Sequence, residues 1–167
     1  MNQANISTNA VISTSIFETN SFLLKNKNTT LIEYAAFYGS IQIFQYLQNN
    51  NAELTPSLWL YAIHSKNAEL LFLLEENKIE KSIDKCLIES IKCHHNDFVN
   101  YFVDNNEINL NDYFVYLLKY YNIEYVKPEF IQKSFLFEYI KYDYTVFYKD
   151  LIYDVDINKI KKISNQN

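Results

Sequence analysis

Glycine and proline are almost absent from this 167-residue chain, which contains one glycine, Gly39, and two prolines, Pro56 and Pro128. Sheet sandwiches and barrels need many tight turns, and glycine and proline favour the backbone conformations of those turns. Their scarcity argues against an all-β fold and favours helices joined by short connections. The length suits a single domain that buries a real hydrophobic core.

Positive charge is also scarce. The chain has 15 Lys and Arg residues against 20 Asp and Glu residues, and its net charge is −5. The electrostatic pattern of a nucleic-acid binder is therefore missing. No apolar run approaches the roughly 20 residues of a membrane span, and the start, MNQANISTNAVISTS, lacks the features of a signal peptide. Two cysteines make no disulfide framework. We expect a cytoplasmic protein, with a nuclear location left open, that binds neither nucleic acid nor membranes.

Apolar residues are abundant instead, and they recur at a fixed period. Four segments align: FYGSIQIFQYL (37–47), HSKNAELLFLL (64–74), KCHHNDFVNYF (92–102) and KYYNIEYV (119–126). One column of this alignment holds Gly39, Lys66, His94 and Tyr121, at spacings of 27, 28 and 27 residues. Four residues after each column member an apolar pair begins, at Ile43, Leu70, Phe98 and Tyr125. A fixed period with matched columns is typical of stacked repeats.

Each repeat reads as two helices. Apolar residues precede the column at helical spacing, as in Leu31, Ile32, Tyr34 and Ala35, and an i, i+4 stripe follows it. Glycine suits the left-handed residue that ends a helix, so Gly39 is expected to be the hinge of a helix hairpin. The sequence thus predicts an all-α fold, an α-solenoid of stacked helix-turn-helix repeats with a shared apolar core.

The ends of the elements can also be predicted. Ser15 and Glu18 match a capping box for a helix that runs to about Lys25, and Thr55-Pro56 matches an N-cap followed by proline at the first helical position. The period ends at Pro128. We predict one domain, 1–167, with an N-terminal capping helix in 1–27, four short repeats in 28–127 and divergent C-terminal capping helices in 128–167.

The segment TLIEYAAFYGSIQIFQYLQNNNAEL (30–54) resembles an ankyrin repeat. The matching positions are Thr30, Ala35, Ala36, Gly39, Ile43 and Leu47. The resemblance extends over about residues 28–127 and implies a divergent ankyrin-like domain, since these repeats have 27 or 28 residues where ankyrin repeats have about 33. The missing residues imply that the usual β-hairpin fingers are shortened to inter-repeat loops.

Catalytic and metal-binding patterns are weak. Cys86, Cys93, His94 and His95 form the one cluster of soft ligands, but Cys86 and Cys93 would lie about 10 Å apart along a helix axis. The repeat already explains His94 and His95 as hinge residues. Cys93 beside His94 suggests a nucleophile and a base, yet sequence neighbours on a helix point about 100° apart. A chain with one glycine lacks a phosphate-binding loop. We expect no metal, no cofactor and no enzymatic activity.

The resemblance implies a binding surface. In ankyrin-like stacks the first helices line a concave face, and the two free positions before each hinge contact the partner. Here these positions are Phe37, Tyr38, His64, Ser65, Lys92, Cys93, Lys119 and Tyr120. The leading hypothesis is a non-catalytic module that binds a protein or peptide. The alternative is a structural segment of a longer repeat array, which a groove filled by the chain's own side chains would favour.

Overall fold

The computed structural model describes residues 7–126 and 135–144, whose regular secondary structure is helical apart from one isolated β-bridge. The predicted all-α class is therefore confirmed for these residues. The chain divides into two compact units, Met1–Phe102 and Val103–Asn167. Among the helices of the described ranges, none has the length and apolarity that a membrane crossing requires. Most of the predicted C-terminal capping region, 128–167, lies outside the described residues.

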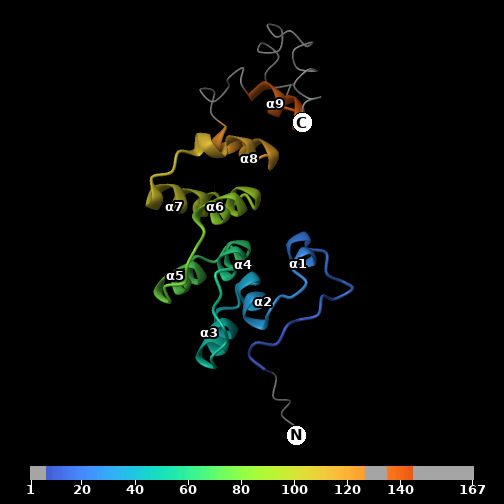
Figure 1. Ribbon diagram of the computed structural model, residues 1–167, viewed down its shortest axis with the longest axis vertical. Helices are drawn as coiled ribbons and strands as arrows, with labels where there is room; N and C mark the ends of the chain where they lie inside the picture. The colour runs from blue at the N-terminus through green and yellow to red at the C-terminus, as the bar shows by residue number, and fades with distance from the viewer. Residues whose placement is uncertain (1–6, 127–134, 145–167) are drawn as a thin grey trace. The chain divides into compact units, whose positions relative to one another are not determined.

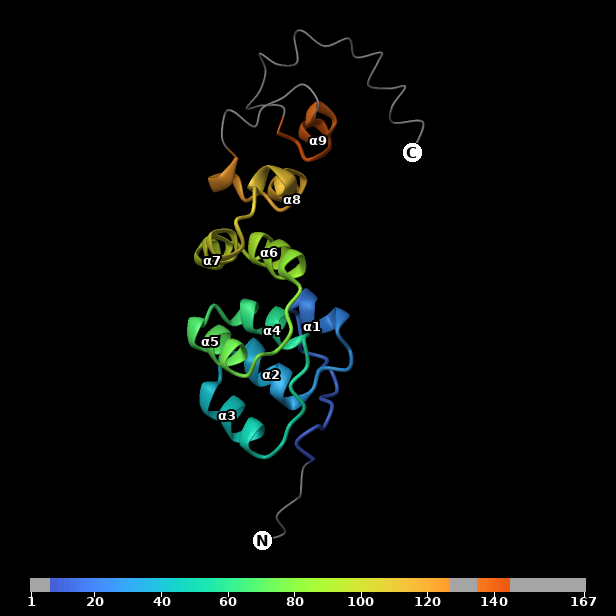
Figure 2. The same cartoon turned by 60° about the vertical axis from the view of Figure 1, so that its left-hand side comes forward.

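Helix hairpins make up most of the first unit (Figure 1). They join α2 (Leu31–Phe37) to α3 (Ile41–Asn49), α4 (Leu58–Ser65) to α5 (Ala68–Glu76), and α6 (Ile83–Lys92) to α7 (Asn96–Asn106). The first helices pack in order, α2 against α4 and α4 against α6. Figure 2 shows α3 and α5 on one side of α2 and α4, with α1 (Ser21–Lys25) on the other side.

The core of this unit takes residues from both helices of each hairpin. The largest fully buried side chains there are Trp59, Phe44, Phe102, Ile32, Leu58, Ile63, Leu70, Leu74, Leu87 and Ile91. Ala36 and Ala62 are fully buried on α2 and α4, and such small side chains let two helices approach closely. The predicted apolar stripe is buried in the second and third hairpins.

The first hairpin departs from that stripe. Ile43 of α3 is 55% exposed, whereas the equivalent Leu70 and Phe98 are 0% and 6% exposed. Phe44, the next residue, is buried like its equivalents Leu71 and Val99, so α3 buries only one residue of the apolar pair. The reason is the position of α3 in the chain. Both α5 and α7 come after the second helix of a preceding hairpin, whereas α3 belongs to the first hairpin of the described chain and has no such helix before it. The prediction that Ile43 lies in the shared core is wrong.

The predicted hinge column is confirmed by the backbone. Gly39, Lys66, His94 and Tyr121 all have left-handed φ angles, of 66°, 55°, 56° and 56°. At three hinges the following residue donates its N–H to the carbonyl five residues earlier: Ser40 to Ala35 (2.9 Å), His95 to Ser90 (3.0 Å) and Asn122 to Leu117 (2.9 Å). This bond closes the helix as in a Schellman motif.

A second left-handed column, which the sequence pattern did not indicate, ends the second helices. Its members are Asn51, Lys78 and Glu107, with φ of 61°, 53° and 52°. The same bond recurs after each: Ala52 to Leu47 (3.0 Å), Ile79 to Leu74 (3.1 Å) and Ile108 to Val103 (3.2 Å). Both kinds of turn are thus closed by a left-handed residue, although only one of these residues is glycine.

Glycine at two of these positions is expected to stabilise the chain. A side chain at left-handed φ costs about 1–2 kcal/mol, and glycine's backbone entropy offsets part of the gain. Lys66→Gly and Lys78→Gly, both at exposed positions, should each raise the free energy of unfolding by about 0.5–1 kcal/mol. Lys85→Gly inside α6 is the matched control and should lower it by about 1 kcal/mol. Urea denaturation measures all three, and equal losses would contradict the left-handed hinges.

The N-terminal segment is mostly extended. The predicted helix from Ser15 is reduced to the five residues of α1, capped by Asn20, whose Oδ1 accepts the N–H of Phe22 at 2.9 Å. Residues 10–12 instead run antiparallel to 29–31, since Ile12 donates to the Thr29 carbonyl at 2.8 Å. The capping box at Ser15 is wrong, because the Glu18 carboxylate accepts the N–H of Asn20 at 2.7 Å.

The start of α4 also differs from the prediction. Ser57 is the N-cap and Leu58 the first helical residue. The Thr55 carbonyl accepts the N–H of Leu58 at 3.1 Å, so Thr55 and Pro56 form the turn before the helix. The Ser57 hydroxyl donates to the carboxylate of Glu33, which also completes a capping box with Thr30 at the start of α2. These bonds link the starts of neighbouring first helices.

The second unit contains η1 (Leu110–Tyr113), α8 (Phe114–Lys119), η2 (Ile123–Tyr125) and α9 (Leu136–Lys141). Its core holds Phe114, Leu118, Tyr139 and Tyr144. Phe114 lies 4.8 Å from Phe135 and 5.8 Å from Tyr139 between ring centroids, so the aromatic residues of this region fill its core. The second helix of the predicted fourth repeat is reduced to the three residues of η2.

Candidate functional site

The eight residues predicted to contact a partner differ widely in exposure. Tyr38 is 54% exposed, Phe37 is buried, and His64, Ser65, Lys92 and Cys93 are half-buried. In the second unit Lys119 is exposed and its Nζ lies 5.2 Å from the ring of the half-buried Tyr120. The structure therefore leaves Tyr38 and Lys119 as the most accessible of the eight.

Phe22 of α1 covers part of the predicted surface. Its ring centroid lies 4.2 Å from that of His64 and 5.9 Å from that of Phe37, and it meets Tyr61 edge-on at 4.9 Å. Phe22 itself is only 8% exposed. The aromatic area expected to receive a partner at the ends of α2 and α4 is thus occupied by a residue of the same chain. The repeat pattern gave no signal for Phe22, which precedes the repeats.

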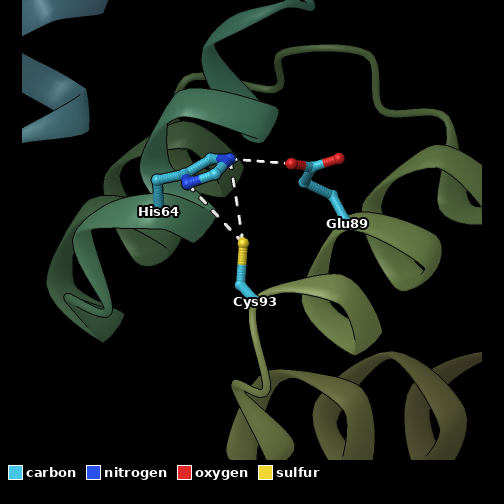
Figure 3. Close-up of side chains that lie close together, drawn as sticks. All are labelled: His64, Glu89 and Cys93. Carbon is cyan, nitrogen blue, oxygen red and sulfur yellow. Dashed lines mark hydrogen bonds and ion pairs between the residues drawn. The ribbon is translucent and has the colours of Figure 1, made fainter. Parts of the chain in front are cut away.

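His64, Glu89 and Cys93 come together between α4 and α6 (Figure 3). His64 is in the last turn of α4, while Glu89 and Cys93 are four residues apart at the end of α6 and so share a helix face. His64 Nε2 lies 2.7 Å from Glu89 Oε1, and Cys93 Sγ lies 3.6 Å from His64 Nδ1 and 3.7 Å from Nε2. The ligand atoms all lie within 4.8 Å of one another.

Glu89 joins two basic groups. Lys92 Nζ donates to Glu89 Oε1 at 2.6 Å, beside the bond to His64. Burial by itself would raise the pKa of Glu89, but the hydrogen bonds from His64 and Lys92 outweigh it and the pKa is lowered. The His64 and Glu89 side chains are only 12% and 13% exposed, so His64 does not project freely toward a partner. Glu89 was missed in the sequence analysis. The one feature of the sequence that could have indicated its role is its position four residues before Cys93, which puts both residues on one face of a helix.

Cys93 is poorly arranged for nucleophilic catalysis. Burial, together with the negative charge of Glu89, raises the pKa of its thiol to about 12, so the reactive thiolate is scarce near neutral pH. Sγ is nearly equidistant from both nitrogens of His64. A sulfur in line with either nitrogen's lone pair would be much closer to that nitrogen than to the other. His64 is therefore badly placed to take the thiol proton.

The soft ligands considered from the sequence are separated in the structure. Cys86 is 1% exposed, and burial raises the pKa of its thiol to about 11. His95 donates from Nδ1 to the Ile63 carbonyl at 2.7 Å, which ties the hinge of the third hairpin to the end of α4. Among the described residues, the group that could hold a metal is His64, Glu89 and Cys93.

An apolar groove of about 300 Å³ lies between α5 and α7 in the first unit. It is lined by Ala68, Leu71, Phe72, Glu75, Asp97, Phe98 and Tyr101. Phe72 is 63% exposed. The sequences of α5 (AELLFLLEE) and α7 (NDFVNYFVDNN) contain five acidic residues and no Lys, Arg or His. Glu75 is paired with Lys81 at 2.6 Å and accepts a hydrogen bond from Tyr101, so Asp97 is the groove's other acidic residue.

Mild acid is expected to destabilise the first unit through His95. Burial lowers its pKa below the usual 6.5, against the effect of its bond to Ile63. Neutral His95 therefore contributes stability that is complete above the unfolded-state pKa and is lost as pH falls through the folded-state pKa. The melting temperature should fall between roughly pH 7 and pH 5, and fall less in His95→Gln. His94→Gln is the control, and an unchanged pH dependence in His95→Gln would contradict this role.

No protein-family model matches the sequence, and neither a curated protein nor a solved structure is significantly similar to it. The resemblance to ankyrin repeats therefore stays a prediction. The chain's candidate functional surfaces are the half-buried cluster of His64, Glu89 and Cys93 and the α5–α7 groove.

Proposed function

We propose that this chain is a non-catalytic binding module with divergent ankyrin-like repeats, which holds a basic amphipathic helix of a protein partner. The observation that carries the proposal is the apolar groove between α5 and α7. Its lining includes Leu71, Phe72 and Phe98, and Phe72 is 63% exposed. Large exposed aromatic residues beside a groove are characteristic of protein interfaces.

The charge around the groove selects the partner's chemistry. Lys81, from the loop after α5, pairs with Glu75 at 2.6 Å. The sequences of α5 and α7 themselves carry acidic residues, Asp97 of the groove among them, and no basic ones, so a segment with Lys or Arg on its polar face complements them. A helix that lays its apolar face into such a groove contacts it through residues at i, i+3, i+4 and i+7. Increasing salt concentration should weaken this complex, because rim charges are screened.

Repeat geometry supports the ankyrin-like part of the proposal. The four hinges recur every 27 or 28 residues with left-handed φ, and the first helices pack in order against one another. Such stacks present extended surfaces that serve as binding platforms. The contact surface proposed here differs from the one expected from the resemblance, because Phe22 already covers Phe37 and His64.

A displayed library of random helical peptides, selected on the full chain, tests the proposal. Binders should carry Lys or Arg opposite an apolar face, and Phe72→Glu should weaken them at least tenfold. The matched control is Tyr46→Glu, since Tyr46 of α3 is also an exposed aromatic residue on a second helix, at 65%. Binders that survive Phe72→Glu but are lost in Tyr38→Ala would place the site on the first helices. A selection without binders would contradict the proposal.

Two observations favour the alternative function, a structural segment of a longer array. The first is that Phe22 of the same chain covers Phe37 and His64 on the surface expected to receive a partner. The second is an uncovered apolar face on α3. Ile43 and Tyr46 are 55% and 65% exposed on α3, although the positions equivalent to Ile43 are buried in α5 and α7. This face is suited to receive another hairpin of the same kind. Sedimentation equilibrium tests it: self-association that Ile43→Glu abolishes would support the alternative, and a monomer at every concentration would count against it.

A further inference from the structure

We propose that His64, Glu89 and Cys93 form a binding site for one zinc-class divalent metal ion between α4 and α6. The three side chains come from the ends of two packed helices, and their ligand atoms lie within 4.8 Å of one another. They are half-buried, so the surrounding protein holds them while solvent still reaches the site. This inference is independent of the α5–α7 groove.

Tetrahedral coordination requires the three side chains to rotate from the positions they hold without an ion. Zinc bonds of about 2.0–2.1 Å to nitrogen and oxygen and about 2.3 Å to sulfur put tetrahedral N and S ligands about 3.6 Å apart, and N and O ligands about 3.3 Å apart. Cys93 Sγ is 3.7 Å from His64 Nε2 but also 3.6 Å from Nδ1, so the sulfur has to rotate away from the ring face toward the lone pair of one nitrogen. Glu89 Oε1 lies 2.7 Å from Nε2, and the three ligand atoms span up to 4.8 Å, so the carboxylate has to move off the Nε2 lone pair and toward Cys93 to admit the ion.

The donor set selects the class of ion. One imidazole nitrogen, one thiolate sulfur and one carboxylate oxygen suit zinc and similar transition metals, whereas magnesium and calcium take oxygen ligands. Three protein ligands leave a fourth position for water or for a side chain of a partner. The chain would thus hold the ion in an accessible site, not in a closed structural one.

The Lys92 ammonium and the proton of the Cys93 thiol both compete with the metal ion. Lys92 Nζ donates to Glu89 Oε1 at 2.6 Å, but its side chain is 31% exposed and can move into solvent. The Cys93 thiol loses its proton to solvent when the sulfur–metal bond forms, so each bound ion releases this proton and affinity rises with pH. The metal ion should therefore bind weakly in acid, because the thiol keeps its proton, and more tightly when Lys92 is removed, because Glu89 is then released from its partner.

Cobalt(II) is the first probe, added to the full chain after chelator treatment. A cysteine ligand gives a sulfur-to-cobalt charge-transfer absorption in the near ultraviolet, which the wild type should show at one ion per chain. Cys93→Ser should abolish this absorption, and Cys86→Ala, the matched control at the other cysteine, should keep it. No absorption in the wild type, or an absorption that survives in Cys93→Ser, would overturn the proposal.

Zinc competition against a colorimetric chelator then tests the other ligands. His64→Gln and Glu89→Gln should weaken zinc at least tenfold, and Lys92→Ala should tighten it several-fold. His94→Gln is the control for His64→Gln, because His94 is a hinge residue outside the cluster. Far-ultraviolet circular dichroism confirms that each variant folds. Affinity that depends on His94 and not on His64, or that is unchanged in Lys92→Ala, would overturn the assigned site.

Discussion

Trp59→Ala is expected to lower the free energy of unfolding by about 3–5 kcal/mol, the range for truncating a large buried aromatic residue. Trp59 is 1% exposed on α4, the middle first helix of the first unit. Its Nε1 donates to the Ile79 carbonyl at 3.1 Å, and the Lys81 ammonium lies 4.7 Å from its ring centroid. One residue thus fixes α4 to the loop that leads from α5 to α6.

Trp59→Phe separates the two contributions. It keeps most of the buried aromatic area but removes the donor to the Ile79 carbonyl, so the expected loss is smaller, about 1–3 kcal/mol. Because Trp59 is the only tryptophan of the chain, unfolding in urea has to be followed by far-ultraviolet circular dichroism in all variants. A loss below about 1 kcal/mol in Trp59→Ala would show that Trp59 is not a core residue.

Leu70→Ala is expected to cost about 2–5 kcal/mol, while Ile43→Ala at the equivalent repeat position should cost less than about 0.5 kcal/mol. Leu70 is fully buried and Ile43 is 55% exposed. The two residues are 27 positions apart in the repeat and have side chains of equal size. Their difference therefore measures what the preceding hairpin contributes to the burial of a second helix.

Urea denaturation of both variants gives this comparison. Phe44→Ala is a useful third variant, because Phe44 is the buried residue of the apolar pair in α3 and is 0% exposed. It should cost about 3–5 kcal/mol. Equal losses in Ile43→Ala and Leu70→Ala would mean that the first hairpin has the same surroundings as the second, contrary to the structure.

The hinges were predictable because a helix hairpin must reverse at the same point in every repeat. The alignment on Gly39 located the left-handed residues Lys66 and His94 although neither is glycine. The second column was missed, since no glycine marks Asn51 or Lys78 and their segments vary in sequence. The burial of Ile43 was mispredicted for a different reason: periodicity shows which face is apolar but not whether a neighbour covers it.

The candidate sites were only partly predictable. The alignment placed His64 and Cys93 at the free positions before two hinges, and the structure brings them within 3.7 Å of each other. The same reasoning missed Glu89, because a single acidic residue on a helix resembles any solvated position. It also missed Phe22, which packs on His64 from outside the repeats. Contacts between a cap and a repeat leave no periodic signal in a single sequence.

Helix hairpins joined at left-handed hinges recur every 27 or 28 residues along the chain. Backbone nuclear magnetic resonance of the full chain tests this recurrence most directly, through the chemical shifts and the coupling between amide and α protons at Lys66, His94 and Tyr121. We expect positive φ at these three residues, with helical values at Ile63 and Ile91 before them. Negative φ at Lys66 and His94, with helix continuing through both, would contradict this expectation.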